Sequence, residues 1–467
     1  MPTTLFKTTQ KLQLAKQKIA RKQKCIKQLS AKLNQVSRSR LKWRTKYCEL
    51  KKQQQKIRVK HHPYCLKMIW LGVVLHIHHN LSLRACSAAL YETAQLYGHK
   101  IKRISASTIR SWTMRMGHYY LQMRLSAGSY VLIADESILI GNQKILVMLA
   151  VTQERICRIA PLTMEDVTVI HVQTSTSWKG ADIAQLIKDK SKQVGVEFTY
   201  AISDKGHNLR KAFAICELPW IEDVTHYIAN QTRHIFEQDK DFNGFIARQQ
   251  LTRAKWALSQ YAPFLPPNVR KKARFHQLLV SAEWGQRVLA HWSELPPEVQ
   301  IELVYVVDCK LLIEILTQLR MIVDSFSKLV KSKGISGFSQ ASWQQTRLAL
   351  VANWQQQGWC LCDRVTAFLD SLDAYLERSL LVLCGQDQLL CCSDVLESMF
   401  GKYKQGAHKQ VISGESVKIA AFGRLIDQGD IVSGMGCISH RVLRAEEAKR
   451  PVSLTKLRQK SLAKIAT

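Results

Sequence analysis

Three acidic residues of this chain have the type and placement of ligands for divalent metal ions. Asp135 follows the apolar run Tyr130–Ala134, and Asp204 follows a second run, Phe198–Ser203, so both acids stand at the ends of expected strands. Glu397 lies far downstream, in a segment expected to be helical. Two acids at strand ends and one on a helix can converge on a pair of divalent ions. Such a pair stabilises the attacking and leaving oxygens when a phosphodiester is cut or joined.

Each acid also has a structural explanation. Asp135 could be an ordinary turn residue, although it is in phase with the end of its strand whereas Glu136 is not. Asp204 could cap the helix that follows it, a role compatible with metal binding. Asp394 competes with Glu397 for the third position. It lies one turn earlier, near the expected helix start, where an acid complements the helix dipole whatever the function.

The helix that carries Glu397 has further residues suited to a phosphate backbone. Gly401 and Lys404 share a face with Glu397 at helical spacing. Lys404, two turns on, could reach a phosphate, and Gly401 would let a backbone approach closely. We therefore expect Lys404 to contact nucleic acid beside the acids.

A fourth acid and a histidine lie downstream of Asp204. Two residues separate Asp223 from His226. The pair could brace the metal ligands by hydrogen bonds, or His226 could act directly on the scissile phosphate. Because a lone histidine is more often structural, both explanations stay open.

The composition points to a polyanionic partner. The chain has 467 residues, which predicts two to four domains, and its 46% hydrophobic content can fill a sizeable core. Its formal net charge is +32, and residues 1–60 hold 19 Lys or Arg and one acid, Glu49, which is +18 of that total. Such self-repulsion is tolerated mainly where phosphates neutralise it, so we expect DNA as the partner.

Cysteine usage and hydropathy predict a cytoplasmic protein. The 13 cysteines form no Cys-x-x-Cys pair, and several lie in apolar stretches, which indicates reduced and buried thiols. The charged N-terminal residues do not resemble a secretory signal, and the apolar run Met68–Val74 is too short to span a bilayer. We expect a soluble, nucleoid-associated protein with no membrane partner.

Residues 1–60 are expected to form a basic coiled coil. No Gly or Pro interrupts residues 10–52, and ten of twelve seam positions of a heptad frame are apolar or Ala. The outer positions are almost uniformly cationic, which suits a phosphate backbone. The alternative is a solvated basic tail that folds only on DNA. The a positions are Leu12, Ile19, Ile26, Leu33, Arg40 and Tyr47, and the d positions are Ala15, Lys22, Leu29, Val36, Trp43 and Leu50.

Residues 61–124 are expected to form a helix-turn-helix DNA-binding domain. A first helix begins near Asn80–Arg84, and a second opens with a Ser/Thr cap cluster after Ile104. Its outward residues would contact DNA and its apolar face would pack inward. The alternative is a plain helical hairpin. The outward residues are Thr108, Arg110 and Arg115, and the inward residues are Ile109, Trp112 and Met116.

Residues 125–239 are expected to hold a mixed β-sheet with helices packed on it. The order is three strands, a helix, a strand, a helix and a last strand, which is a meander followed by βαβ units. The expected strands are Tyr130–Ala134, Lys144–Val151, Val167–Gln173, Glu197–Ser203 and Val224–Ala229, with helices at Gly180–Lys192 and from Asn208.

The remaining chain divides into three parts. Residues 240–390 contain no convincing strand and are expected to be an all-helical domain, whose tryptophans should mostly be core. Trp343, Trp354 and Trp359 could instead form a platform for a flipped base. Residues 391–438 would return to the sheet with the helix of Glu397. Residues 439–467 are a basic tail with no clear motif.

In this order, the motifs resemble those of DDE transposases of the RNase H-like superfamily, of the kind encoded by bacterial insertion sequences. The first acid lies in Leu132–Ser137, the second in Ala201–His207, and the third in Leu396–Lys404 after a large helical segment. Asp223-Val-Thr-His226 matches a [Cys/Asp]-x-x-His motif found in several transposase superfamilies. The resemblance covers residues 125–240 and 390–425, and residues 66–122 fit the family's DNA-binding region more loosely.

The resemblance implies a DNA transposase with an RNase H-like mixed α+β core and an all-α insertion. Two Mg²⁺ ions, with Mn²⁺ as a substitute, would be held by Asp135, Asp204 and Glu397, with Asp223 bracing them and His226 close to the chemistry. The substrates would be double-stranded DNA, both element ends and target, and the protein would be a homodimer or a higher homo-oligomer. A metal-dependent nuclease without strand transfer and a domesticated, non-catalytic DNA-binding protein are the alternatives.

Overall fold

A computed structural model describes residues 3–56, 59, 62–98, 101–138, 144–156, 162–269, 278–332, 340–382, 390–406, 413–439 and 441–443. The chain divides into two compact units, Met1–Ile69 and Trp70–Thr467. Within these ranges, no helix combines the length and apolar character that crossing a membrane requires.

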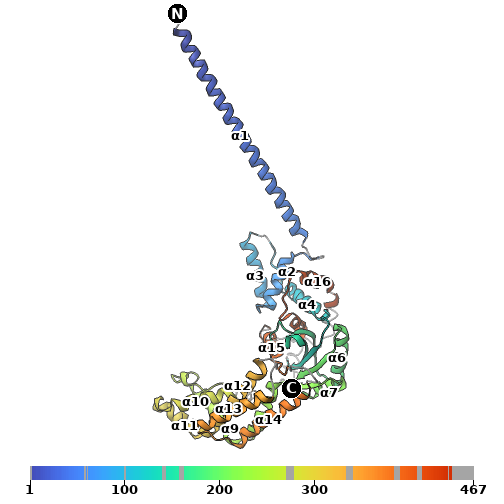
Figure 1. Ribbon diagram of the computed structural model, residues 1–467, viewed down its shortest axis with the longest axis vertical. Helices are drawn as coiled ribbons and strands as arrows, with labels where there is room; N and C mark the ends of the chain where they lie inside the picture. The colour runs from blue at the N-terminus through green and yellow to red at the C-terminus, as the bar shows by residue number, and fades with distance from the viewer. Residues whose placement is uncertain are drawn as a thin grey trace, which may run out of the picture. The chain divides into compact units, whose positions relative to one another are not determined.

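Helix α1 (Thr3–Lys56) dominates the first unit (Figure 1). It is a single helix of 54 residues, so the predicted helix over residues 10–52 is confirmed and extended at both ends. Neither Gly nor Pro occurs within it, and nothing in its sequence therefore breaks the backbone hydrogen bonds. Its side chains from Lys18 to Glu49 are all exposed.

Three helices follow, α2 (Leu66–Ile77), α3 (Leu83–Leu96) and α4 (Ala106–Gln122). The two predicted cap clusters are confirmed. The Ser82 side chain accepts the Ala85 N–H at the start of α3, and Ser105 accepts the Thr108 N–H at the start of α4. Local sequence therefore determines where both helices begin.

The protein has a mixed α and β architecture with one five-stranded sheet. The strands are β1 (Tyr130–Ile138), β2 (Lys144–Thr152), β3 (Thr168–Ser175), β4 (Phe198–Ser203) and β5 (Trp220–Glu222), with a one-turn helix α5 (Gln153–Ile156) after β2. Their order is β3-β2-β1-β4-β5. Strand β2 is antiparallel to β1 and β3, whereas β4 is parallel to β1 and β5 is parallel to β4. The first four predicted strands are confirmed.

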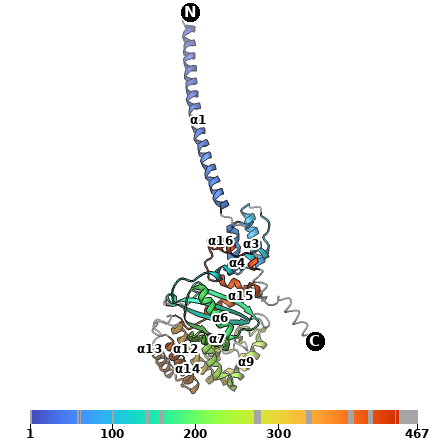
Figure 2. The same ribbon diagram turned by 90° about the vertical axis from the view of Figure 1, so that its right-hand side faces the viewer.

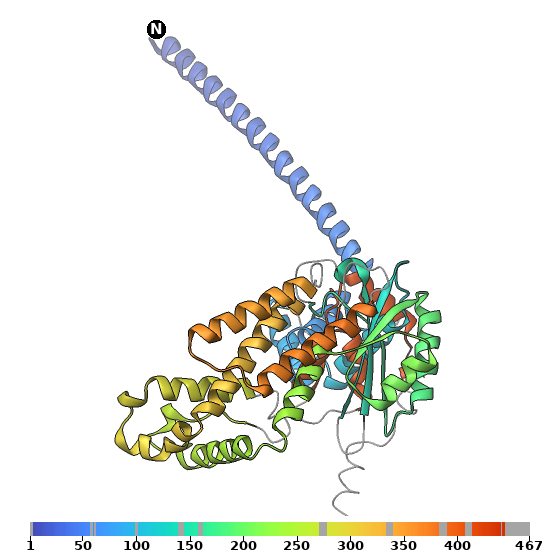
Figure 3. The same ribbon diagram turned by 60° about the horizontal axis from the view of Figure 1, so that its bottom comes forward.

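Helices α6 (Gly180–Val194) and α7 (His207–Ile215) cover one face of the sheet (Figure 3). Alternate residues of each strand point to this face, as the two-residue period of a strand requires. They pack against the apolar faces of the two helices to form a continuous buried core. Its members include Leu132, Ala134, Leu146, Met148, Ile183, Ile187, Leu209 and Phe213.

The predicted strand Val224–Ala229 is wrong. The last strand, β5, ends at Glu222, and helix α8 (Val224–Phe236) begins where the strand was expected. Asp223 caps this helix, and the buried residues recur at helical rather than alternating spacing. The β-branched residues in the run suggested a strand, but the cap and the apolar face favour the helix. The buried residues of α8 are Val224, Tyr227, Ala229, Thr232 and Phe236.

The described residues of 240–382 form helices joined by turns and loops, with no strand among them. The elements are α9 (Lys240–Trp256), α10 (Leu278–Ala290), α11 (Pro297–Asp308), α12 (Lys310–Ser332), α13 (Gln340–Gln356) and α14 (Asp363–Leu381), with 3-10 turns η1 (Ala262–Phe264) and η3 (Trp292–Glu294). Most tryptophans of this region are core residues, as predicted: Trp256, Trp284, Trp343 and Trp354 are buried.

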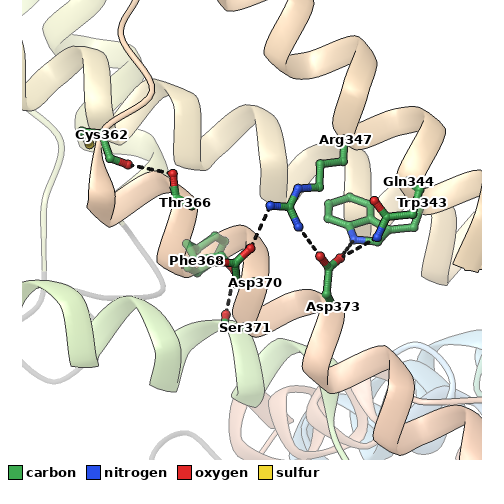
Figure 4. A network of polar contacts seen from close by, with 9 residues as sticks. All are labelled: Trp343, Gln344, Arg347, Cys362, Thr366, Phe368, Asp370, Ser371 and Asp373. Atoms are coloured by element: carbon green, nitrogen blue, oxygen red, sulfur yellow. Dashed lines mark hydrogen bonds and ion pairs between the residues drawn. The ribbon is translucent and has the colours of Figure 1, made fainter.

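A polar network fixes α13 against α14 (Figure 4). Asp373 accepts hydrogen bonds from the indole of buried Trp343 and from Arg347, which also pairs with Asp370 at 2.8 Å. Helix α14 in turn contacts the edge of the sheet, because the Tyr375 hydroxyl donates to the Glu222 carbonyl at 2.8 Å. The helical region is therefore anchored at the end of β5.

The chain returns to the sheet through α15 (Asp394–Gly406), η4 (Ser413–Ala421) and α16 (Gln428–Cys437). Both η4 and α16 pack against α4, more than 290 residues earlier (Figures 1 and 2). A side chain at Gly117 would lie 2.2 Å from the Val417 carbonyl, so this glycine permits a close backbone approach. Tyr120 also donates to Asp430 at 2.8 Å. Helix α4 is thus enclosed by the C-terminal part of the chain.

Candidate active site

Three aspartates lie in one row across the parallel strands. Ile133 of β1 pairs with Ile202 of β4, which pairs with Ile221 of β5. Asp135, Asp204 and Asp223 each follow one of these three isoleucines by two residues. Since side chains alternate along a strand, all three carboxylates belong to the face opposite α6 and α7. Neighbouring strands are about 4.8 Å apart, so Asp135 and Asp204 are close neighbours.

A tight turn determines the position of Asp204. Strand β4 ends at Ser203, and Asp204 Oδ1 accepts the Gly206 N–H at 3.0 Å. A Cβ on Gly206 would lie 2.8 Å from that same oxygen. The glycine thus leaves room for the Asp204 carboxylate to lie over the turn. Helix α7 begins directly after this turn, at His207.

Helix α15 brings Glu397 to the same face of the sheet. Its apolar side is buried, with Leu396, Met399 and Tyr403 fully enclosed, and this orientation leaves Glu397 half exposed. Helix α15 packs against β1. Lys404, two turns after Glu397, donates to the Ser137 hydroxyl at 2.6 Å. A positive charge therefore lies two residues beyond Asp135 on the face that carries the acids.

The charges of these acids act on one another. Burial, together with the negative charges of Asp204 and Glu397, raises the pKa of Asp135 to about 7. The nearby His226 works in the opposite direction. The three predicted ligands therefore lie close enough to interact electrostatically, although they come from β1, the end of β4 and α15.

Asp223 occupies the same row but has a different environment. Its Oδ1 accepts the His226 N–H at 2.9 Å, which caps α8. Its Oδ2 accepts the N–H of Ser393 at 2.5 Å and the Ser393 hydroxyl at 2.8 Å, at the start of α15. In return, Thr225 donates to Asp394 at 3.1 Å. These bonds hold the first turns of α8 and α15 together.

The sequence predicted the bracing role of Asp223 only in general terms. The hydrogen bonds of Asp223, Ser393, Thr225 and Asp394 that join the two helices are called the helix bracket here. Ser393 and Thr225 were not predicted as site residues. The position of Ser393 directly before an expected helix start was the available signal. The hydrogen-bond partner of such a residue depends on the tertiary structure, so the local sequence cannot predict it.

His226 and Glu397 form the contact between the two helices. His226 Nε2 lies 3.3 Å from Glu397 Oε1. This hydrogen bond raises the pKa of His226 to about 9, against the effect of burial, with support from the negative charges of Asp223 and Asp135. At neutral pH the imidazole is therefore protonated and forms an ion pair with Glu397. It supplies positive charge among clustered carboxylates.

Asp135, Asp204 and Glu397 fit a divalent cation by their chemistry. All three offer carboxylate oxygens, the donors that Mg²⁺ and Mn²⁺ prefer. Burial and, after it, the neighbouring negative charges raise the pKa of Asp135, and a cation beside these carboxylates would offset both effects. Their donor chemistry therefore suits such an ion, although the ligand atoms of these three residues do not all lie within 4.8 Å of one another.

A second group of potential ligand atoms lies beside this cluster. Asp223, Cys392 and Asp394 have ligand atoms within 4.8 Å of one another and could hold a metal ion. The two acids, however, already accept the hydrogen bonds of the helix bracket, and a sulfur ligand does not suit Mg²⁺. An ion here would compete with those bonds for the carboxylate oxygens. We therefore favour the carboxylate cluster.

Helix α4, which was predicted to contact DNA, is only partly accessible to a partner. Arg115 was expected to point outward, which is wrong: it is 4% exposed and donates to the Met435 carbonyl at 3.2 Å. Burial lowers its pKa. Arg110 and Thr108 lie in the first turns of α4 and are half-buried, and the Thr108 hydroxyl bonds to Ser105 at 2.8 Å.

Arg115 is enclosed because α16 covers this part of α4. Six consecutive residues of α4, Trp112 to Gly117, are buried. The N-terminal turns of the helix, preceded by the exposed Lys102 and Arg103, remain partly accessible, as do residues at its C-terminal end. Such a helix could contact DNA by its N-terminus, where helix-turn-helix proteins place their base contacts, but not along its length.

The helical region also contains a cavity of about 670 Å³, remote in sequence from the acids. It lies between α9, the start of α12 and the start of α14. Its charged lining is balanced, with Lys240, Arg248 and Arg364 against Asp241, Asp308 and Asp363. The cavity therefore shows no charge preference for a phosphate, and none of the predicted site residues line it.

No protein-family model matches this chain, and no curated protein matches it in sequence.

Proposed function

We propose that this protein is a DNA transposase of the DDE type, which cuts element ends and joins them to target DNA with the help of divalent metal ions. One observation carries the proposal: Asp135 and Asp204 each stand two residues after the paired residues Ile133 and Ile202 of the parallel strands β1 and β4, and the charges of Asp204 and Glu397 both act on Asp135. A chain of net charge +32 makes a polyanion the natural substrate.

Under this proposal, Asp135, Asp204 and Glu397 hold two Mg²⁺ ions, for which Mn²⁺ can substitute. The ions would supply activation of the attacking hydroxyl and stabilisation of the leaving oxygen. Asp204 is kept in place by the Gly206 N–H, and Glu397 by its ion pair with His226. Lys404 adds a positive charge beside Asp135 that can bind the DNA backbone.

Two roles are open to His226. As a positioning residue, it orients Glu397 through their ion pair, and Asp223 fixes it by capping the helix on which it lies. As a catalytic residue, it would donate a proton or a hydrogen bond to the phosphate once Glu397 is engaged elsewhere. The raised pKa of His226 suits the donor form in both roles.

The fold supports the proposal in its order of elements. A three-stranded meander is followed by two parallel strands, each reached through a helix, as expected for an RNase H-like core. The helical region between α8 and α15 corresponds to the proposed insertion. The proposal includes DNA ends and target as partners, a homo-oligomeric assembly and a location at the nucleoid.

Strand cleavage and strand transfer test the proposal together. Full-length protein is incubated with its own flanking DNA, a supercoiled target plasmid and Mg²⁺ or Mn²⁺. Nicks at the ends and joined products are expected, and both should disappear with a chelator. Metal-dependent cleavage without joining would instead indicate a nuclease. Specific DNA binding without cleavage in either metal would indicate a non-catalytic binding protein.

A further inference from the structure

Helix α1 carries an exposed apolar seam. Seven large side chains at its a and d positions are 57 to 68% exposed. They recur with the alternating three- and four-residue spacing of a coiled coil, which a second helix would cover. Leu41, at an outer position, is exposed to the same degree and does not belong to the seam. The seam residues are Ile19, Ile26, Leu29, Leu33, Val36, Trp43 and Tyr47.

The charges around this seam all oppose pairing with a second copy. Lys22 and Arg40 interrupt the seam itself, at a d and an a position. The flanking e and g positions of the exposed stretch contain only neutral or basic residues. Coiled coils normally place opposite charges at e and g, where they select the partner. The basic members are Lys16, Lys18, Lys32, Arg44 and Lys46.

The occupant that fits the seam is another copy of α1. An identical helix brings the same repeat, so its apolar seam residues can face those of the first helix except at Lys22 and Arg40. The only acid of the first 60 residues, Glu49, lies at an outer c position and cannot offset the flanking cations. Apolar burial therefore favours the pair, while charge repulsion over the same length opposes it.

We propose that α1 self-associates only when its charge is neutralised, so that a polyanion controls the assembly of this protein. A phosphate backbone along the helix pair would screen the repulsion and release the apolar attraction. By thermodynamic linkage, self-association must then raise the affinity for the polyanion by the same factor. DNA is the polyanion that the proposed function supplies, but the inference does not require the cleavage chemistry.

The response to salt without DNA is the first test. The association state of the full-length protein is measured by sedimentation or mass photometry from low to high salt. Because added salt screens repulsion but not apolar burial, the associated fraction should increase with salt. Association that is complete at low salt, or that falls as salt is added, would overturn the proposal.

Matched variants assign this behaviour to the seam. Leu29→Ala with Leu33→Ala should abolish association at every salt concentration, whereas Leu41→Ala should leave it unchanged. Replacing Lys18, Lys32 and Lys46 with Gln should give association at low salt without any polyanion. If the paired leucine variant associates like wild type, the seam is not the interface.

Addition of a random-sequence duplex at low salt is the last step. It should raise the associated fraction of wild type at least tenfold and have no such effect on the paired leucine variant. This contrast separates true pairing from two chains that bind independently to one duplex. Equal loading of both proteins would overturn the coupling, and the result does not depend on whether the protein cuts DNA.

Discussion

The two ends of one row of aspartates show how similar sequence positions acquire different roles. Asp135 and Asp204 each accept a backbone hydrogen bond and lie among other negative charges. Asp223, one strand further along, is 1% exposed and accepts three hydrogen bonds from α8 and α15. Asp223 is thus held by protein donors in a structural role, although burial still raises its pKa. A carboxylate that faces other carboxylates needs a cation.

The largest expected effect lies at the Asp135–Asp204 end. Replacing Asp135, Asp204 or Glu397 with Ala should lower the cleavage rate at least about a thousandfold, because each loss removes about 4 kcal/mol of transition-state stabilisation. The rate is measured on end DNA in Mg²⁺ and in Mn²⁺. The thermal unfolding midpoint of each variant should not fall.

The control for this series is Glu136→Gln. Glu136 is adjacent to Asp135 but points to the other face and pairs with Lys144 at 3.3 Å, so activity should be retained. Asp394→Ala would be a poor control because Asp394 accepts the Thr225 hydroxyl in the helix bracket. If all three alanine variants cleave normally, the two-metal proposal is wrong.

Substitutions of Asp135 and of Asp223 should change the free energy of unfolding in opposite directions. The folded-state pKa of Asp135 is raised from 3.8 to about 7, so its contribution to stability is present below pH 3.8 and is lost as pH rises to about 7. Asp135→Asn should therefore stabilise the cation-free protein at pH 8 by up to about 4 kcal/mol. The gain should disappear at low pH. Denaturant unfolding with a chelator, at both pH values, measures it, and a destabilised Asn variant at pH 8 would contradict the account.

Substitution of Asp223 should instead lower the free energy of unfolding. Asp223→Ala leaves the N–H groups of His226 and Ser393 without their acceptor, and should cost about 3 kcal/mol of unfolding free energy. Asp223→Asn keeps one acceptor oxygen and should cost less. The same unfolding experiment detects both. A fully stable Ala variant would mean that the bracket does not hold the helices together.

Two glycines provide the finest comparison. Gly206→Ala would bring a methyl group within 2.8 Å of Asp204 Oδ1 and displace the carboxylate, so cleavage should fall about tenfold, or about 1.4 kcal/mol. At Gly244, on α9, an added Cβ meets open space, and Gly244→Ala should cleave like wild type. Rates measured side by side test the pair. Equal rates would show that the turn at Gly206 does not position Asp204.

Sequence patterns were most informative where local chemistry decides the structure. Strand ends, helix caps and helical spacing were sufficient to bring Asp135, Asp204 and Glu397 together as candidates. The run after Asp223 was predicted as a strand because its residues favour strands, yet the Asp223 cap and the spacing of the apolar residues make it a helix.

Residues whose environment comes from distant segments were not predictable in this way. The spacing of apolar residues along its helix predicted that Arg115 would be exposed. The carbonyl that it binds belongs to Met435, which is 320 residues away. The partners of Asp223 across α15 are hidden for the same reason, since Ser393 is 170 residues distant.

Binding of Mn²⁺ to the DNA-free, full-length protein tests the central claim most directly. Calorimetry or electron paramagnetic resonance gives the affinity without any knowledge of the DNA substrate. The account predicts saturable binding that weakens at least tenfold in Asp135→Asn and Asp204→Asn and is unchanged in Cys392→Ser. Binding that survives both Asn substitutions but is lost in Cys392→Ser would contradict it, and would place the ion at Asp223, Cys392 and Asp394 instead.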